Sequence, residues 1–107
     1  MKYKVITLCG STRFKEDFIK AQEMLTLQGW IVLTVGLFGH ADNKYQEVIT
    51  PEIKEMLDDM HKRRIDMSDA IYVINRNDYI GESTSSEIQY AMKQGKEIMY
   101  MFEDAER

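Results

Sequence analysis

The sequence has little of what builds disulfide scaffolds or membrane spans. Its 107 residues include one cysteine, Cys9, so neither a disulfide nor a multi-cysteine metal site can form within one chain. No run approaches the roughly 18 apolar residues that a membrane span needs. The segment MKYKVITLCG is too short and too rich in β-forming residues for a signal peptide. We therefore expect a protein of the reducing cytoplasm that has no membrane partner.

Proline and glycine are also scarce, at one and six residues, and no repeat, low-complexity segment or linker stands out. A chain of this length without linkers predicts one domain over residues 1–107. The glycine fingerprints GxGxxG and GxxxxGK[ST] are absent. Their absence argues against a dinucleotide-dependent enzyme and against an NTPase, and we expect no cofactor.

The net charge and the histidines limit which partners, metal sites and catalytic sets the sequence can support. The net charge of −4 argues against binding to a nucleic acid polymer or to an anionic membrane surface. The basic run Lys62-Arg63-Arg64 is interpreted as a solvated helix face. His40 and Asp42 could coordinate a metal, but two residues at that spacing are a weak signal, and we expect no metal site. No Ser-His-Asp or Cys-His set can be picked out, and Cys9 is expected to be buried and inert.

Apolar segments alternate with amphipathic ones along the chain. Strands are predicted at residues 3–9, 31–35, 70–74 and 97–102, where apolar and β-branched residues gather. Phe14, Phe18, Ala21 and Leu25 share one face of a first helix that should end near Gly29.

The second helix has clear start signals. It should begin at Thr50-Pro51, with threonine as the N-cap and proline at the first helical position, and end before Ser68-Asp69. We expect its buried stripe to be Ile53, Met56, Leu57 and Met60. A third helix follows Gly81, stops near Gly95, and should bury Ile88, Ala91 and Met92.

This alternation predicts an α/β fold, a single-domain flavodoxin-like three-layer sandwich. Its four- to five-stranded parallel sheet should have the order 2-1-3-4, with right-handed crossovers. The topological switch then falls between the first and third strands, and ligands bind there at the carboxyl ends of the strands. The turn at 10–13 and the segment 75–87 should meet at this crevice. The long segment 36–50 is a candidate lid, because it leaves the sheet at the same end.

Glu87 is the candidate reacting group, because it lies about one turn into its helix at the edge of the buried stripe. The helix N-terminus should favour its charged form, and a carboxylate there could attack an electrophilic carbon. The alternative is a solvated helix glutamate. The hydroxyl-bearing residues before Glu87 could bind a phosphate or simply cap the helix, and Arg13 could bind an anion or be an ordinary surface residue.

The residues from Ile6 to Phe14 resemble the opening strand and glycine-serine turn of the nucleoside 2-deoxyribosyltransferase-like superfamily. The segments 68–75, 81–91 and 95–96, with the pattern Ser-Asp, strand, loop, Glu-x-x-Tyr-Ala and Gly-Lys, resemble its second half. Together these matches span most of the chain, which looks most similar to a small uncharacterised bacterial and phage branch of that superfamily.

The resemblance implies an N-glycosidase or 2-deoxyribosyltransferase-like enzyme that acts on a (deoxy)nucleoside or nucleotide, with Glu87 as the nucleophile. It also implies a homodimer or higher homo-oligomer. The chain departs from the family at two positions: family members have aspartates where this sequence has His61 and Gly81. Either His61 or the neighbouring Glu82 could take over the acid–base work of these aspartates, and His61 is the second candidate catalytic residue. The expected ligand-binding residues are Gly10, Ser11, Thr12, Arg13, Asn75, Gly81, Glu82, Ser83 and Thr84.

Two alternatives to an enzyme stay open. One is a non-catalytic nucleotide- or nucleotide-sugar-binding module that keeps the fold and the helix N-terminus. The other is a structural or regulatory homo-oligomer without a ligand. Ligand-dependent stabilisation separates the second from the first, because a ligand that binds only the native state raises its stability.

Overall fold

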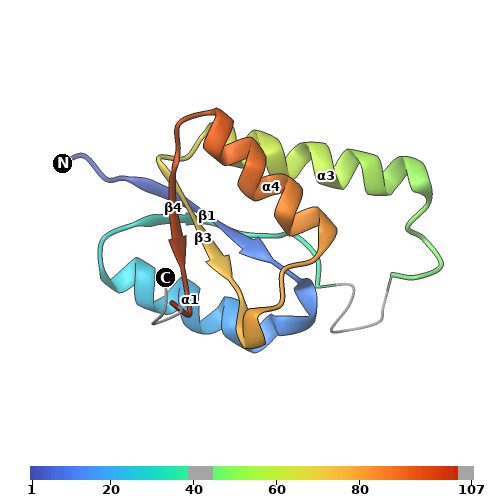
Figure 1. The fold of residues 1–107 in the computed structure, drawn as a ribbon, viewed down its shortest axis with the longest axis horizontal. Coiled ribbons are helices and arrows are strands. Elements are labelled where there is room, and N and C mark those ends of the chain that lie inside the picture. The colour runs from blue at the N-terminus through green and yellow to red at the C-terminus, as the bar shows by residue number, and fades with distance from the viewer. Residues whose placement is uncertain (39–44, 104–107) are drawn as a thin grey trace.

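Four parallel strands form one sheet in the computed structural model, which describes residues 1–38 and 45–103. The strands are β1 (Val5–Gly10), β2 (Ile31–Leu33), β3 (Ala70–Ile74) and β4 (Glu97–Tyr100). Their order is β2-β1-β3-β4, and every neighbouring pair is parallel (Figure 1). The predicted α/β class and strand order are therefore confirmed.

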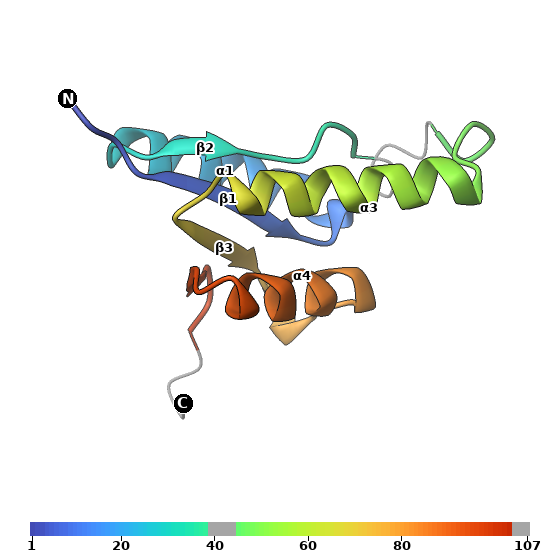
Figure 2. The ribbon, with the colours of Figure 1, turned by 90° about the horizontal axis from the view of Figure 1, so that it is seen from above.

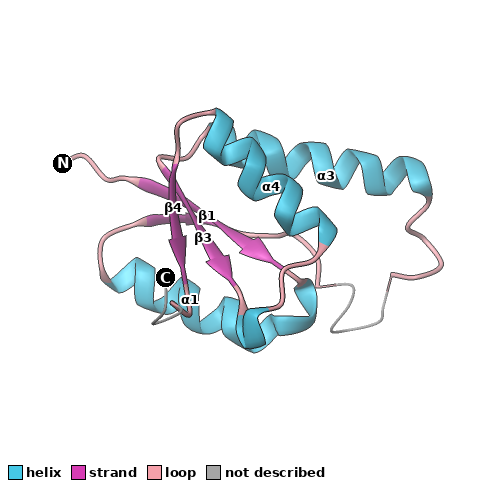
Figure 3. Ribbon diagram, in the orientation of Figure 1, coloured by secondary structure: helices cyan, strands magenta, loops and turns pink. Residues whose placement is uncertain are grey.

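Helices cover both faces of this sheet in the described part of the chain. One face carries α1 (Lys15–Leu27), and the other carries α3 (Pro51–Asp66) and α4 (Glu82–Lys93) (Figure 3). This is the expected three-layer, flavodoxin-like arrangement. None of the helices in residues 1–38 and 45–103 combines the length and the apolar character needed to cross a membrane.

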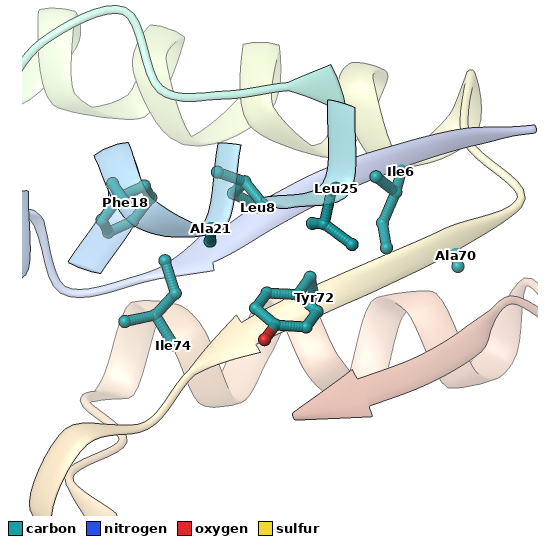
Figure 4. Close-up of a cluster of buried hydrophobic side chains, with 8 residues drawn as sticks. All are labelled: Ile6, Leu8, Phe18, Ala21, Leu25, Ala70, Tyr72 and Ile74. Atoms are coloured by element: carbon teal, nitrogen blue, oxygen red, sulfur yellow. The ribbon is translucent and has the colours of Figure 1, made fainter. Parts of the chain in front are cut away.

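The core is divided by the alternation of side chains along the strands. Ile6 and Leu8 of β1 point toward α1, where they meet Phe18 and Leu25, and Tyr72 of β3 joins them (Figure 4). The residues between them face the other way, because successive strand side chains point to opposite faces. Cys9, Ile71 and Val73 thus pack against Ile65 of α3 and Ala91 of α4.

The helix boundaries follow the sequence signals. The Thr50 hydroxyl accepts a hydrogen bond from the Ile53 amide at 3.2 Å, and Pro51 is the first residue of α3. Gly29 and Gly95 follow the C-caps of α1 and α4 with φ of +95° and +73°, a conformation that glycine adopts readily.

Two helices bury less than their sequence pattern predicts. Met56 and Met60 are 52% and 42% exposed, and Met92 of α4 is 63% exposed. In α3 the buried residues are His61 and Ile65, one to two turns further on. For α3 the reason is visible in Figure 2, where its first turns extend past the ends of the strands. The helical period is right, but no described element covers that part of the stripe.

Candidate active site

Three ionisable side chains from three elements meet beneath the carboxyl end of β1. Cys9 comes from β1, His61 from α3 and Glu87 from α4. The Cys9 Sγ lies 3.5 Å from His61 Nε2, and that nitrogen lies 3.8 Å from Glu87 Oε1. One side-chain atom from each residue falls within 4.8 Å of the other two. Within residues 1–38 and 45–103, no other group of three or more His, Cys, Asp or Glu side chains is arranged so that it could hold a metal ion. We call this group the Cys-His-Glu cluster.

Glu87 is the member of this cluster that reaches the surface. Cys9 is fully buried, and the His61 side chain is 6% exposed. The Glu87 side chain keeps 13% of its surface exposed. A ligand arriving from solvent therefore meets Glu87 first, with the other two residues behind it.

Burial controls the titration of Glu87. Desolvation, reinforced by the negative charge of Asp58, raises its pKa from 4.5 to about 7. A hydrogen bond from Cys9 and the positive charges of Lys62 and Lys54 oppose this rise. The net shift is therefore opposite to the one expected from the helix N-terminus, which should favour the charged form.

The other two members are held uncharged at neutral pH. Burial, together with the adjacent guanidinium of Arg64, lowers the pKa of His61 to about 4. Burial and the neighbouring Glu87 raise the pKa of the Cys9 thiol well above its ordinary value. His61 and Glu87 are close enough for an ion pair, but at neutral pH the imidazole is neutral. At 3.8 Å the two atoms are also too far apart for a direct hydrogen bond, so the neutral imidazole and the carboxyl are neighbours without a direct bond.

The loops after β1 and β3 meet beside the cluster, as the topological switch predicts. The Arg13 guanidinium carbon lies 4.5 Å from the centre of the Tyr79 ring, and its Nη2 donates to the Tyr79 hydroxyl at 3.4 Å. The Ser11 hydroxyl accepts hydrogen bonds from the backbone and side chain of Arg13. A Cβ on Gly81 would lie 3.2 Å from the same tyrosine hydroxyl. Arg13, Ser11 and Tyr79 thus hold the two loops together.

Five of the expected ligand-binding residues lie around this mouth, four of them at the start of α4. Gly81 is the N-cap of α4 and supplies no side-chain cap, Glu82 and Ser83 are exposed in the first turn, and Thr84 is buried there. Thr12 begins a short 3-10 helix, Thr12–Phe14, and is half-buried. The first turn of α4 therefore presents backbone N–H groups toward the loop from β1.

Gly10 and Asn75 have structural roles that account for them. A Cβ on Gly10 would lie 3.0 Å from both the Cβ and the carbonyl oxygen of Ile74, so β1 and β3 approach closely there. Asn75 is fully buried, and its amide donates to the Phe102 carbonyl at 2.8 Å and accepts from the Phe102 amide at 3.0 Å. The Asn75 side chain therefore fastens the chain after β4 instead of facing the crevice.

Sequence reasoning missed three contributors to this site. Cys9 is buried, as expected, but it lies against His61, so a Cys-His contact does exist. Arg64 was interpreted as part of a solvated basic face, yet its Nη1 lies 3.2 Å from His61 Nδ1. No sequence pattern indicated that Tyr79 would be part of the site. The helical spacing of His61 and Arg64, three residues apart, was the one clue available, since such residues share a face.

The donor atoms of the Cys-His-Glu cluster suit a transition metal, but the surroundings of His61 do not. Sulfur, imidazole and carboxylate ligands are those of zinc sites. A metal-bound histidine, however, donates its second ring N–H to an acceptor. Here the second nitrogen, Nδ1, faces the guanidinium of Arg64, which can only donate. The other metal hypothesis, His40 with Asp42, lies outside the described residues.

Two shallow hollows in the described surface lie away from the cluster. One of about 470 Å³ is lined by the outer side of α1, including Lys20 and Leu27, and one of about 270 Å³ lies by Tyr3 and Trp30. Phe38, from the candidate lid, stacks edge-on against Phe18 on the α1 side of the sheet. The next residues, 39–44, lie outside the described part of the chain.

Comparison with known proteins adds no identity. No protein-family model matches the chain, and no curated protein matches it. A function must therefore be argued from the residues and their geometry.

Proposed function

We propose that the chain is a nucleoside 2-deoxyribosyltransferase-like enzyme that cleaves the N-glycosidic bond of a (deoxy)nucleoside or nucleotide. Glu87 is the nucleophile in this proposal. The observation that carries it is the position of Glu87, which is the solvent-reaching member of a buried cluster at the switch point of a parallel sheet. The sequence resemblance independently selects the same residue.

The chemistry proceeds by two displacements. The Glu87 carboxylate attacks C1′ of the sugar, the C1′–N bond breaks, and its electron pair leaves with the base, which takes up a proton from water. The resulting glycosyl ester is then attacked at C1′ by water or by a second base, which loses a proton, and the carboxylate is regenerated. A carboxylate suits this route because the oxocarbenium-like transition state is stabilised by nearby negative charge.

The pKa of Glu87 suits work near neutral pH. With a pKa of about 7, the carboxyl is present in both forms there, and desolvation makes the ionised form a stronger nucleophile than a solvated glutamate. The first step needs the ionised form. The rate should therefore rise with pH through the neutral range.

The mouth of the site offers groups for the rest of the substrate. Backbone N–H groups at the start of α4 and the exposed Ser83 suit a 5′-phosphate or 5′-hydroxyl. Gly10 to Arg13 border the opposite side of the crevice and suit the sugar and base. Arg13 is exposed and stacked on Tyr79, which makes a flat edge on which a base can lie.

The direct test is release of free base. The protein is incubated with a panel of deoxynucleosides and their 5′-monophosphates, and bases are resolved by liquid chromatography. Glu87→Gln should lose at least about a hundredfold in rate, since it removes the nucleophile. Glu97→Gln makes the same chemical change on an exposed residue at the opposite end of the sheet and should leave the rate unchanged. No release from any substrate contradicts the proposal.

A binding module without catalysis is the second candidate, because the Cys-His-Glu cluster is nearly closed and leaves the Glu87 side chain only 13% exposed. In that case a nucleotide binds at the start of α4 without reaching Glu87. Calorimetry separates the two: unchanged affinity in Glu87→Ala, with no turnover in the wild type, favours the module.

A further inference from the structure

Arg64 fixes where the proton of His61 lies. Its Nη1 is 3.2 Å from His61 Nδ1. A guanidinium carries five N–H donors and no acceptor, so Nδ1 must be the acceptor of this hydrogen bond. A neutral imidazole has one protonated nitrogen, and that nitrogen is then Nε2. The contact with Arg64 thus selects one of the two tautomers of His61.

The Nε2–H of His61 faces the two other members of the cluster. Cys9 Sγ is 3.5 Å away and satisfies a hydrogen bond, Glu87 Oε1 at 3.8 Å is too far for one, and the Leu8 carbonyl is a further acceptor beside the ring. When the sulfur accepts from Nε2–H, its own S–H is left to donate, and Cys9 hydrogen-bonds to Glu87. An ionised carboxylate accepts only, so the sequence of bonds must stop there.

We propose that Arg64, His61 and Cys9 form a one-way hydrogen-bond chain that ends on Glu87 and steadies its carboxylate. Arg64 and Cys9 are positioning residues in this arrangement, because neither has to touch the substrate. The direction follows from the two ends, a group that can only donate and a group that can only accept. The effect on reaction rate rests on the proposed function, but the chain itself does not.

The surrounding charges keep this direction at neutral pH. The groups facing His61 are Arg64, the Leu8 carbonyl and Asp58, and burial with Arg64 prevails, so the ring stays neutral. Asp58, Lys62 and Lys54 of α3 face Glu87. The two lysines favour the carboxylate, and Asp58 disfavours it. Cys9 is the hydrogen-bond donor among these groups, so its removal should act on Glu87 separately from charge.

Nitrogen-15 NMR of the histidine ring tests the first link without any need for turnover. In the wild type we expect Nε2 protonated and Nδ1 unprotonated from about pH 6 to 8, well above the pKa of about 4. Arg64→Leu should mix the tautomers, and Arg64→Lys should restore the single one, because an ammonium also only donates. Arg63→Leu removes the same charge from an exposed neighbour and should leave the ring unchanged.

Carbon-13 NMR titration of the Glu87 carboxyl tests the last link. Cys9→Ala should raise the pKa of Glu87 by about one pH unit, because it deletes the donor to the charged form. Cys9→Ser keeps a donor and an acceptor of similar size and should leave the pKa near that of the wild type. This pair does not depend on whether Arg64→Leu folds.

Three results would overturn the proposed hydrogen-bond chain. They are an unprotonated Nε2 in the wild type, a Glu87 pKa that is the same in Cys9→Ala and the wild type, and zinc that shifts Nε2 on addition. If the NMR results hold but no base is released from any substrate, the proposed function fails alone. If base is released but His61 carries its proton on Nδ1, the hydrogen-bond chain fails and the proposed function stands.

Discussion

Glu87 shows at the residue scale how burial outweighs a helix N-terminus. A charge near a helix end gains about 0.3–1 kcal/mol from the dipole. Moving the pKa of Glu87 from 4.5 to about 7 corresponds to about 3 kcal/mol in the opposite direction. The sequence reveals the first effect from the position of Glu87 in its helix. It does not reveal the second, which depends on the packing of α3 and α4 that removes the carboxyl from solvent.

This balance predicts a pH-dependent stability for Glu87→Gln. The folded-state pKa of Glu87 lies above the unfolded one, so its ionisation costs stability increasingly as pH rises from about 4.5 through 7. Glutamine mimics the protonated form and removes this cost. The variant should match the wild type near pH 5 and exceed it by about 1–3 kcal/mol near pH 8.

Urea denaturation at several pH values measures this difference. His61 adds a pH dependence of opposite sign to the stability of both the wild type and the variant. Its stability contribution is present above about pH 6.5 and is lost as pH falls toward 4. Comparing the variant with the wild type at each pH therefore largely cancels it. Two stability curves that stay parallel from pH 5 to 8 would show that Glu87 is not desolvated.

At the scale of elements, the close approach of β1 to β3 depends on Gly10. The sequence places this glycine in a candidate ligand-binding turn, whereas the structure shows that its missing side chain makes room for Ile74. The backbone of Gly10 also has a φ of +155°, which side-chain-bearing residues rarely adopt. Both features belong to the strand pair that carries Cys9.

We predict that Gly10→Ala destabilises the fold by about 1–3 kcal/mol, as is typical of overpacking. The new Cβ would lie 3.0 Å from the Cβ and the carbonyl oxygen of Ile74. Gly36→Ala is the matched control, since its Cβ makes ordinary contact at 3.8 Å and its φ is not positive. Thermal unfolding of both variants tests this prediction. Equal unfolding midpoints for Gly10→Ala and Gly36→Ala would show that the space at Gly10 is not needed for the approach of β1 to β3.

The first turns of α3 depend on local capping, because they extend past the sheet and little tertiary packing supports them. Thr50→Ala removes the side-chain acceptor for the Ile53 amide and should cost about 1 kcal/mol. Thr26→Ala, at an exposed position within α1, should change stability by less than about 0.5 kcal/mol. Chemical denaturation compares them, and a smaller loss for Thr50→Ala than for Thr26→Ala contradicts the capping.

At the scale of the whole molecule, the architecture was accessible from the sequence. The five residues of β3 are all buried and read as an uninterrupted apolar run. The order β2-β1-β3-β4 follows from right-handed crossovers between short strands. Met56 and Met60 were mispredicted because a helical period identifies a face but not whether another element covers it.

The composition of the site was only partly accessible. Glu87 could be singled out from its place after a strand and loop. Its partner His61 lies 52 residues from Cys9 in the sequence, and only the packing of α3 against β1 brings them together. The hydrogen bond from Arg64 was hidden for a simpler reason: a basic residue on a polar helix face is ordinarily solvated.

The central claim is that Glu87 forms a covalent bond to the sugar, and intact-protein mass spectrometry tests it most directly. A nucleotide whose sugar carries fluorine at the 2′ position slows breakdown of the glycosyl ester, so the intermediate should accumulate. We predict a mass increase of one fluorinated sugar, mapped by peptide sequencing to Glu87 and absent from Glu87→Gln. Base release by the wild type with no adduct on Glu87, or with an adduct on another residue, would contradict the account.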